Sequence, residues 1–255
     1  MSMNDKVRDR LLGVASPLAL LLLWELSART GLVDTRFFPA PTSIIKQGVD
    51  LAASGELWGH LSASLQRLLW GSLLGGIPAL LLGIAMGLYR PIRAAIDPLI
   101  SATYPVPKSA ILPLILLIFG LGEASKIVMV ALGVFFPVLI NTITGVLQID
   151  KIYLDVGKNF RASRWQTFRT VALPGALPSI MAGIKLGIGM GLILIAIAEM
   201  VGAKNGIGFM IWDAWQILSV ESMYVGLIVI SILGFLLTLI LNEIEGWILP
   251  WKQER

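Results

Sequence analysis

The sequence predicts an all-α membrane protein with six transmembrane helices, and three observations support this fold class. Hydrophobic residues make up 56% of the chain and charged residues 14%, whereas apolar residues make up roughly 45–50% of an ordinary soluble domain. Six apolar stretches approach or exceed the length of about 20 residues that a helix needs to cross a hydrocarbon core about 30 Å thick. The stretches do not alternate between apolar and polar residues, which favours helices over the strands of a β-barrel.

The six expected spans are bounded by charged residues and form a single domain, 1–255. They are expected at about 11–28, 68–89, 98–122, 127–149, 177–200 and 222–242. The first span contains Pro17 and Glu25 and follows a basic start, as the apolar part of a signal peptide would. Because its apolar run is long and no small-residue cleavage site follows, we expect it to be retained. The third and fifth spans contain Lys108 and Lys185.

The lysine and arginine residues in the connections predict the orientation. If the N-terminus is cytoplasmic, 12 of them lie inside: Lys6, Arg8, Arg10, Arg90, Arg93, Lys151, Lys158, Arg161, Arg164, Arg169, Lys252 and Arg255. The other six then lie outside: Arg29, Arg36, Lys46, Arg67, Lys126 and Lys204. Cytoplasmic connections carry an excess of basic residues, so we expect both termini in the cytoplasm.

Two kinds of local pattern describe how the spans are arranged. Glycines recur at one-turn spacing in the rows Gly71/Gly75, Gly83/Gly87 and Gly183/Gly187/Gly191. Such rows let helix backbones approach closely, so we expect these helices to pack on others, within the subunit or across a dimer. Between the first two spans, a short amphipathic helix carrying Ile44 and Leu51 is expected to end near Gly55 and to lie along the outer membrane surface.

Composition excludes several function classes. The chain has no cysteine and one histidine, His60, so we expect no thiol chemistry, disulfide or metal site. It contains no phosphate-binding Gly-x-x-x-x-Gly-Lys-Ser/Thr motif. The basic residues lie in short gaps between apolar runs, which does not indicate binding of nucleic acid. We therefore expect a chain that catalyses no reaction and binds no cofactor itself.

The expected cytoplasmic segment 150–178 is too long for a simple connection and has an apolar stripe at helical spacing. It predicts two short helices, which Leu173-Pro174 and Leu177-Pro178 should separate from the next span. Its net charge is +3, from five basic residues against Asp150 and Asp155. Composition alone leaves open that this segment rests on anionic lipid headgroups.

Two motifs in this segment are similar to those of a known family. They read Asp155-Val156-Gly157-Lys158-Asn159-Phe160-Arg161-Ala162-Ser163 and, further on, Val171-Ala172-Leu173-Pro174-Gly175. This pattern resembles the EAA loop of ABC importer permeases, which forms a coupling helix that seats in a groove of the ATPase subunit. The resemblance implies that nine residues couple to the ATPase: Asp155, Val156, Gly157, Phe160, Arg161, Ala162, Ser163, Leu173 and Pro174.

Two positions depart from that pattern, with Asp155 where glutamate is usual and Arg161 where glycine is usual. Glycine adopts positive φ freely and arginine does not. We therefore expect the turn at Arg161 to differ from the family's turn or to continue as helix.

Further motifs extend the resemblance along nearly the whole chain. They are Gly55-Glu56-Leu57-Trp58, Pro105-Val106-Pro107 with Leu112-Pro113-Leu114, Phe119-Gly120 with Glu123, and Ala198-Glu199 followed by Gly206-Ile207-Gly208. They are similar to the taurine, alkanesulfonate, nitrate and bicarbonate permease branch. The resemblance implies the transmembrane domain of a type I ABC importer, present as a homodimer in the bacterial inner membrane.

In that branch two permease subunits associate with two ATPase subunits, which bind ATP and Mg²⁺, and an extracytoplasmic binding protein delivers the substrate. The resemblance implies import of a small organic or inorganic anion by alternating access. A neutral or cationic vitamin precursor, carried by the same machinery, is an alternative substrate. An ATP-independent secondary carrier is a further alternative, which the structured basic loop and the lack of an internal repeat disfavour.

Three residues are candidates for the translocation path: Tyr104, Lys108 and Glu199. On a straight helix Lys108 would lie about 16 Å beyond Asp97, near the middle of the bilayer. A lysine there normally faces a cavity or a partner, or it extends to the cytoplasmic interface. Glu199 would lie at the outer mouth or in a hydrogen-bonded packing role, and Lys185 is expected to anchor its helix at the headgroups.

Overall fold

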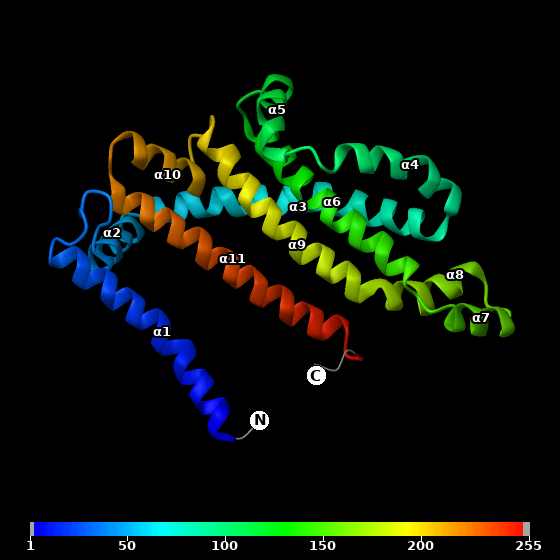
Figure 1. Ribbon diagram of the computed structural model, residues 1–255. Helices are drawn as coiled ribbons and strands as arrows, with labels where there is room; N and C mark the ends of the chain where they lie inside the picture. Colours follow the sequence, from blue (N-terminus) through cyan, green and yellow to red (C-terminus); the bar gives the residue numbers. More distant parts are fainter. Residues whose placement is uncertain (1–2, 252–255) are drawn as a thin grey trace.

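The computed structural model describes residues 3–251, and every regular element in that part of the chain is helical (Figure 1). The elements are α1 (Met3–Arg29), α2 (Pro41–Ala53), α3 (Glu56–Leu88), α4 (Arg90–Thr103), η1 (Lys108–Ile111), α5 (Leu112–Phe119), α6 (Glu123–Leu147), α7 (Lys151–Asn159), α8 (Arg164–Thr167), η2 (Phe168–Ala172), α9 (Leu173–Met200), α10 (Ile207–Gln216) and α11 (Val220–Ile248). Lys252 and Arg255, two of the basic residues used to predict orientation, lie outside the described residues.

Helix α6 forms the centre of the fold, with α3 and α9 packed against it. The glycine rows explain how closely these helices approach. The rows of α3 face α6, where a Cβ added at Gly83 would lie 2.7 Å from the Cβ of Thr142. The row of α9 also faces α6, where a Cβ added at Gly183 would lie 2.7 Å from the Cβ of Asn141. The expectation that these rows pack helices together is thus confirmed, and the contacts lie within the subunit.

Four helical segments of the described chain are long and apolar enough to cross a membrane: Glu56–Leu88, Glu123–Leu147, Trp165–Met200 and Val220–Ile248. A fifth candidate combines Arg90–Thr103 with Lys108–Phe119, two helices bent by 85° relative to each other. The stretch 98–122 is therefore not one continuous helix. Pro105 and Pro107 explain the break, because neither residue has an N–H with which to continue the hydrogen bonds of α4. The crossing of α1 stays a prediction.

The expectation that Leu173-Pro174 and Leu177-Pro178 break the chain is wrong. Helical structure continues from Trp165 to Met200. A π-helical turn, η2, precedes Pro174, and in it the N–H of Leu173 donates to the carbonyl of Phe168. This turn shifts the hydrogen-bond frame by one residue just ahead of Pro174, which has no N–H, so the helix accommodates the proline without ending.

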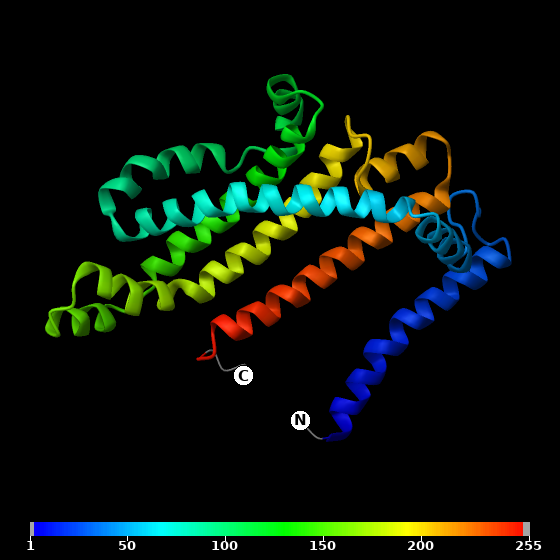
Figure 2. The same ribbon diagram turned by 180° about the vertical axis from the view of Figure 1, so that it is seen from behind.

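A second, smaller core lies at one end of the molecule, where α2 and α10 pack against α11 (Figure 1). Helix α2 is the expected amphipathic helix and buries Ile44 and Leu51. It ends before Gly55, whose φ of 85° marks the turn into α3. Both views place α7 and α8 at the opposite end, and the start of α1 and the end of α11 point towards that same side (Figures 1 and 2).

Candidate functional site

The loop expected to contact the ATPase forms two short helices joined by a sharply defined turn. Helix α7 ends where the N–H of Phe160 donates to the carbonyl of Val156 at 3.0 Å. Helix α8 begins with a reciprocal cap: the N–H of Ser163 donates to Gln166 Oε1 at 2.8 Å, and the N–H of Gln166 donates to Ser163 Oγ at 3.2 Å. Such a capping box satisfies backbone donors that the first turn of a helix leaves free.

Arg161 lies between these two helices with a φ of 54°. Of the two expected outcomes, a continued helix is excluded, because Arg161 takes the left-handed conformation that glycine adopts freely. For a residue with a Cβ this conformation costs about 1–2 kcal/mol. The cap of α7 on one side and the capping box of α8 on the other hold the turn in place, so the neighbouring hydrogen bonds impose the conformation on Arg161.

The residues predicted to couple fall into an exposed group and an anchoring group. In the exposed group, Phe160 keeps 83% of its surface accessible and Val156 47%. Asp155 and Ser163 are also exposed, and Ala162 is half-buried. Gly157 lies within α7.

The anchoring group is Leu173 and Pro174, which are half-buried at the start of α9. Leu173 packs against a core formed by Val146, Ala176 and Ile180. The exposed and anchoring residues lie on consecutive segments of the chain. The exposed turn is thereby connected to the C-terminal end of α6 and the N-terminal end of α9.

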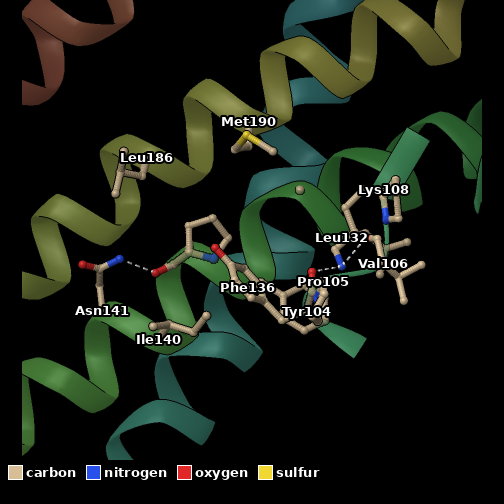
Figure 3. Close-up of a pocket in the computed structure, with 13 residues that line it drawn as sticks. Tyr104, Pro105, Val106, Lys108, Leu132, Phe136, Ile140, Asn141, Leu186 and Met190 are labelled. Atoms are coloured by element: carbon tan, nitrogen blue, oxygen red, sulfur yellow. Dashed lines mark hydrogen bonds between the residues drawn. The ribbon is translucent and has the colours of Figure 1, made fainter. Parts of the chain in front are cut away.

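A hollow of about 450 Å³ lies beside the break between α4 and η1 (Figure 3). One wall is the segment from Tyr104 to Lys108, and the others are α6, through Phe136 and Asn141, and α9, through Met190. The lining is mostly apolar, and Lys108 is its one charged residue in the part of the chain that the structure describes. Two of the three residues predicted for the translocation path, Tyr104 and Lys108, thus share this hollow.

The Lys108 side chain folds back onto its own segment of the chain. Its Nζ donates to the carbonyl oxygens of Thr103, Tyr104 and Val106 at 2.9–3.0 Å. It also lies 4.1 Å from the centre of the Phe136 ring. Carbonyl oxygens at a helix C-terminus and the face of an aromatic ring both stabilise a cation. All three ammonium hydrogens can therefore be used within the protein, while the positive charge remains beside the hollow.

Glu199, the third predicted residue, lies outside this hollow and is fully buried. Its carboxylate accepts hydrogen bonds from Ser64 Oγ at 2.8 and 2.9 Å, from Arg67 Nη1 at 2.8 Å and from the N–H of Gly208 at 3.0 Å. Of the two roles expected for Glu199, the structure shows the hydrogen-bonded packing role.

Arg67 joins four segments of the chain through this network. Its guanidinium donates to both carboxylate oxygens of Glu123 at 2.6 Å, and to the backbone and side-chain oxygens of Asn205 at 2.9 and 2.5 Å. Lys126 is also buried and donates to the carbonyl oxygens of Leu121, Gly122 and Gly202. The start of α6 and the end of α9 are thereby tied to α3 and to the segment that leads into α10. We call Ser64, Arg67, Glu123, Lys126, Glu199 and Asn205 the Arg67 cluster.

Sequence reasoning treated Arg67 and Lys126 only as orientation signals and so missed this cluster. One signal was available: Ser64 and Arg67 are one helical turn apart, as are Glu123 and Lys126, and both pairs stand at the end of an apolar stretch. The pairing across the chain could not be read from spacing. Arg67 and Glu199 are separated by 132 positions.

Lys185 also differs from its expected role. Its ammonium pairs with Glu245 and donates to Asn242, both on α11. The Lys185 side chain is 25% exposed and that of Glu245 15%. Lys185 therefore joins α9 to α11 through an ion pair, where the sequence suggested an anchor among lipid headgroups.

Comparison with known proteins supports the fold and shows the family. The family described as "Binding-protein-dependent transport system inner membrane component" matches residues 79–252. The chain is 36% identical to the taurine transport system permease protein TauC of Escherichia coli (strain K12), over 97% of this chain and 92% of that protein. It is also 36% identical to the putative aliphatic sulfonates transport permease protein SsuC of the same strain, over 98% and 96% of the two chains.

A chain in an inward-facing structure of the MetNI methionine ABC transporter has a TM-score of 0.55 and 20% identity, with 77% of this chain and 95% of that chain covered. At that identity the likeness shows the fold alone. The family match spans well over half of the sequence, and the two relatives named above match it along nearly their whole length. The chain therefore belongs to the binding-protein-dependent transport system inner membrane component family, as the non-catalytic, multi-pass permease subunit of an ABC importer in a bacterial-type inner membrane.

Proposed function

We propose that this permease imports a small sulfonate such as taurine or an alkanesulfonate. The observation that carries the proposal is the positive charge of Lys108 beside a hollow that, among the described residues, no carboxylate lines. The names of the two relatives that match nearly the whole chain support the same substrate class. A neutral or cationic vitamin precursor would gain nothing from this charge.

The geometry of Lys108 suits passage better than tight binding. Its three hydrogens are directed at backbone carbonyls, so an anion in the hollow would feel the charge without a direct, well-aligned hydrogen bond. A transported solute must be held strongly enough to enter and weakly enough to leave. High affinity for the substrate then belongs to the binding protein.

The proposed topology has six spans and two cytoplasmic termini. Helix α1 would supply the first span, and α4 with η1 and α5 a broken third span. Placement of α7 and α8 at the end opposite α2 and α10 supports this orientation (Figures 1 and 2), because it leaves the basic loop on the cytoplasmic side.

The proposed assembly contains two copies of this chain, two ATPase subunits that bind ATP and Mg²⁺, and an extracytoplasmic binding protein. Closure of the ATPase subunits would move the exposed turn around Phe160, and helix α9 would transmit the movement towards the hollow. The continuous helical structure from Trp165 to Met200 supports this route, because a helix without a break transmits displacement along its axis.

Reconstituted vesicles test this proposal. Permease, ATPase and binding protein should together accumulate labelled taurine or an alkanesulfonate when ATP is present on the ATPase side. Uptake should stop when the ATPase loses the lysine of its phosphate-binding loop, and uptake that continues would indicate an ATP-independent carrier. Heat stabilisation of the binding protein by a neutral vitamin precursor and not by any sulfonate would overturn the substrate assignment.

A further inference from the structure

The hollow beside the α4–η1 break has a polar side chain at each end and an apolar middle (Figure 3). Lys108 lies at one end and Asn141 at the other, and Phe136 and Met190 lie between them. On α6, Asn141 follows Phe136, whose ring contacts the Lys108 ammonium, by five residues, or about 7.5 Å along the helix axis. A solute that contacts both ends therefore needs a short chain with a polar group at each end.

The amide oxygen of Asn141 is available to a ligand. The amide nitrogen Nδ2 donates to the carbonyl of Pro137 at 2.8 Å (Figure 3). Because that carbonyl can only accept a hydrogen bond, the nitrogen must face Pro137, and the oxygen Oδ1 must face away from it. Within the part of the chain that the structure describes, no group donates to Oδ1. The half-buried Asn141 side chain therefore keeps a free acceptor in the lining of the hollow.

Helix α6 supplies a second acceptor and holds Asn141 firmly. Pro137 has no N–H, so the carbonyl of Gly133, four residues earlier, loses its usual helical partner, and both residues line the hollow. Asn141 packs closely on α9, where a Cβ added at Gly183 would lie 2.7 Å from the Cβ of Asn141. The α6 wall thus offers fixed acceptors to a donor group, while Lys108 offers a positive charge to an anion.

We propose that Asn141 makes the hollow selective for aminosulfonates, by accepting a hydrogen bond from the ammonium group of a zwitterionic substrate whose sulfonate lies beside Lys108. The inference rests on the proposed function, within which it favours an aminosulfonate such as taurine over an alkanesulfonate. An ammonium group has three hydrogens to donate, whereas an alkyl end has none. An alkyl end would cover the amide oxygen of Asn141 without pairing it, which costs free energy.

The experiment compares the uptake of taurine with that of ethanesulfonate, which lacks the ammonium group, in vesicles that contain permease, ATPase and binding protein. Asn141→Leu keeps a side chain of similar size and removes the amide. It should lower the ratio of the two kcat/KM values, taurine over ethanesulfonate, at least about 10-fold. The preference of the binding protein is the same with either permease, so it does not affect this comparison.

Two further variants test whether the effect belongs to the Asn141 amide. Asn141→Ser should keep part of the preference for taurine, because its hydroxyl can donate to the carbonyl of Pro137 and still accept a hydrogen bond. Thr144→Val is the matched control. The Thr144 hydroxyl also donates to the carbonyl four residues earlier on α6, that of Ile140, at 2.9 Å, but Thr144 does not line the hollow. Its replacement should change the ratio less than about 2-fold.

A second measurement needs no binding protein. The chain contains no cysteine, so Met190→Cys places a single thiol in the lining of the hollow. In the detergent-solubilised complex of permease and ATPase, taurine should slow the reaction of this thiol with a maleimide more than ethanesulfonate does at the same concentration. The difference between the two sulfonates should disappear in Met190→Cys/Asn141→Leu.

The inference is overturned if Asn141→Leu leaves the ratio of the kcat/KM values unchanged, or if Thr144→Val lowers the ratio equally. Equal effects of the two sulfonates on the labelling of Met190→Cys would also overturn it. Failure of the wild-type permease to import either sulfonate would instead refute the proposed function. Uptake of both sulfonates with an unchanged ratio refutes only the role of Asn141, so the two failures are distinguishable.

Discussion

Replacement of Arg67 by leucine is expected to weaken the contacts of α3 with both α6 and α9. The Arg67 side chain is 3% exposed, and that of Glu199, its partner, is 1% exposed. The guanidinium contacts two carboxylates and two oxygens of Asn205. Its removal leaves the buried charge of Glu199 with only the Ser64 hydroxyl and the N–H of Gly208.

The size of the effect follows from the burial. Breaking a buried ion pair by removal of one partner costs about 3–5 kcal/mol, because the remaining charge is left uncompensated. Glu199→Gln removes the charge and keeps an oxygen for Ser64 and Gly208, so it should cost about 1–2 kcal/mol. The double variant Arg67→Leu/Glu199→Gln should lose about 1–3 kcal/mol less free energy of unfolding than the two single variants lose in sum.

The free energy of unfolding can be measured by titration with sodium dodecyl sulfate in mixed micelles. Arg36→Leu is the control, since Arg36 forms an exposed pair with Asp34, and we expect its free energy of unfolding to change little. Two results would refute the reasoning: a loss below about 1 kcal/mol for Arg67→Leu, or strictly additive effects in the double variant.

The other predictions concern the hollow, the helix contacts and the α9–α11 pair. Lys108→Met should lower the kcat/KM of sulfonate uptake about 10-fold, because it removes the charge beside the hollow. Lys108→Arg should retain most of the wild-type kcat/KM. Equal rates for both variants would contradict the role of charge. Gly83→Ala should lower the free energy of unfolding by about 1–3 kcal/mol, because the new methyl group would press on Thr142. Gly76→Ala, where the nearest atom is 3.6 Å away, should not. Lys185→Met should lower the free energy of unfolding by about 1–2 kcal/mol, because the bonds to Glu245 and Asn242 are lost. An unfolding curve identical to that of the wild type would show that these bonds contribute nothing to stability.

Much of this protein follows from sequence alone, because some constraints act locally. A bilayer demands long apolar helices, and each of the four long, apolar helical segments covers all or nearly all of one expected span. Glycine rows at one-turn spacing indicated helix faces that approach closely, since spacing along one helix determines which residues share a face. The loop motif around Phe160 was recognisable because its residues are consecutive.

Tertiary structure alone decided which charges meet. Arg67, Glu123 and Glu199 belong to three different helices, and hydropathy treats each as an isolated polar residue. The backbone conformation at position 161 could not be predicted from the sequence either. An arginine there predicts an altered turn, whereas the hydrogen bonds on either side hold Arg161 at positive φ. A local sequence pattern indicates the free-energy cost of burying one charged residue or of placing one residue at positive φ. The hydrogen bonds and ion pairs that offset this cost come from residues that only the folded chain brings into contact.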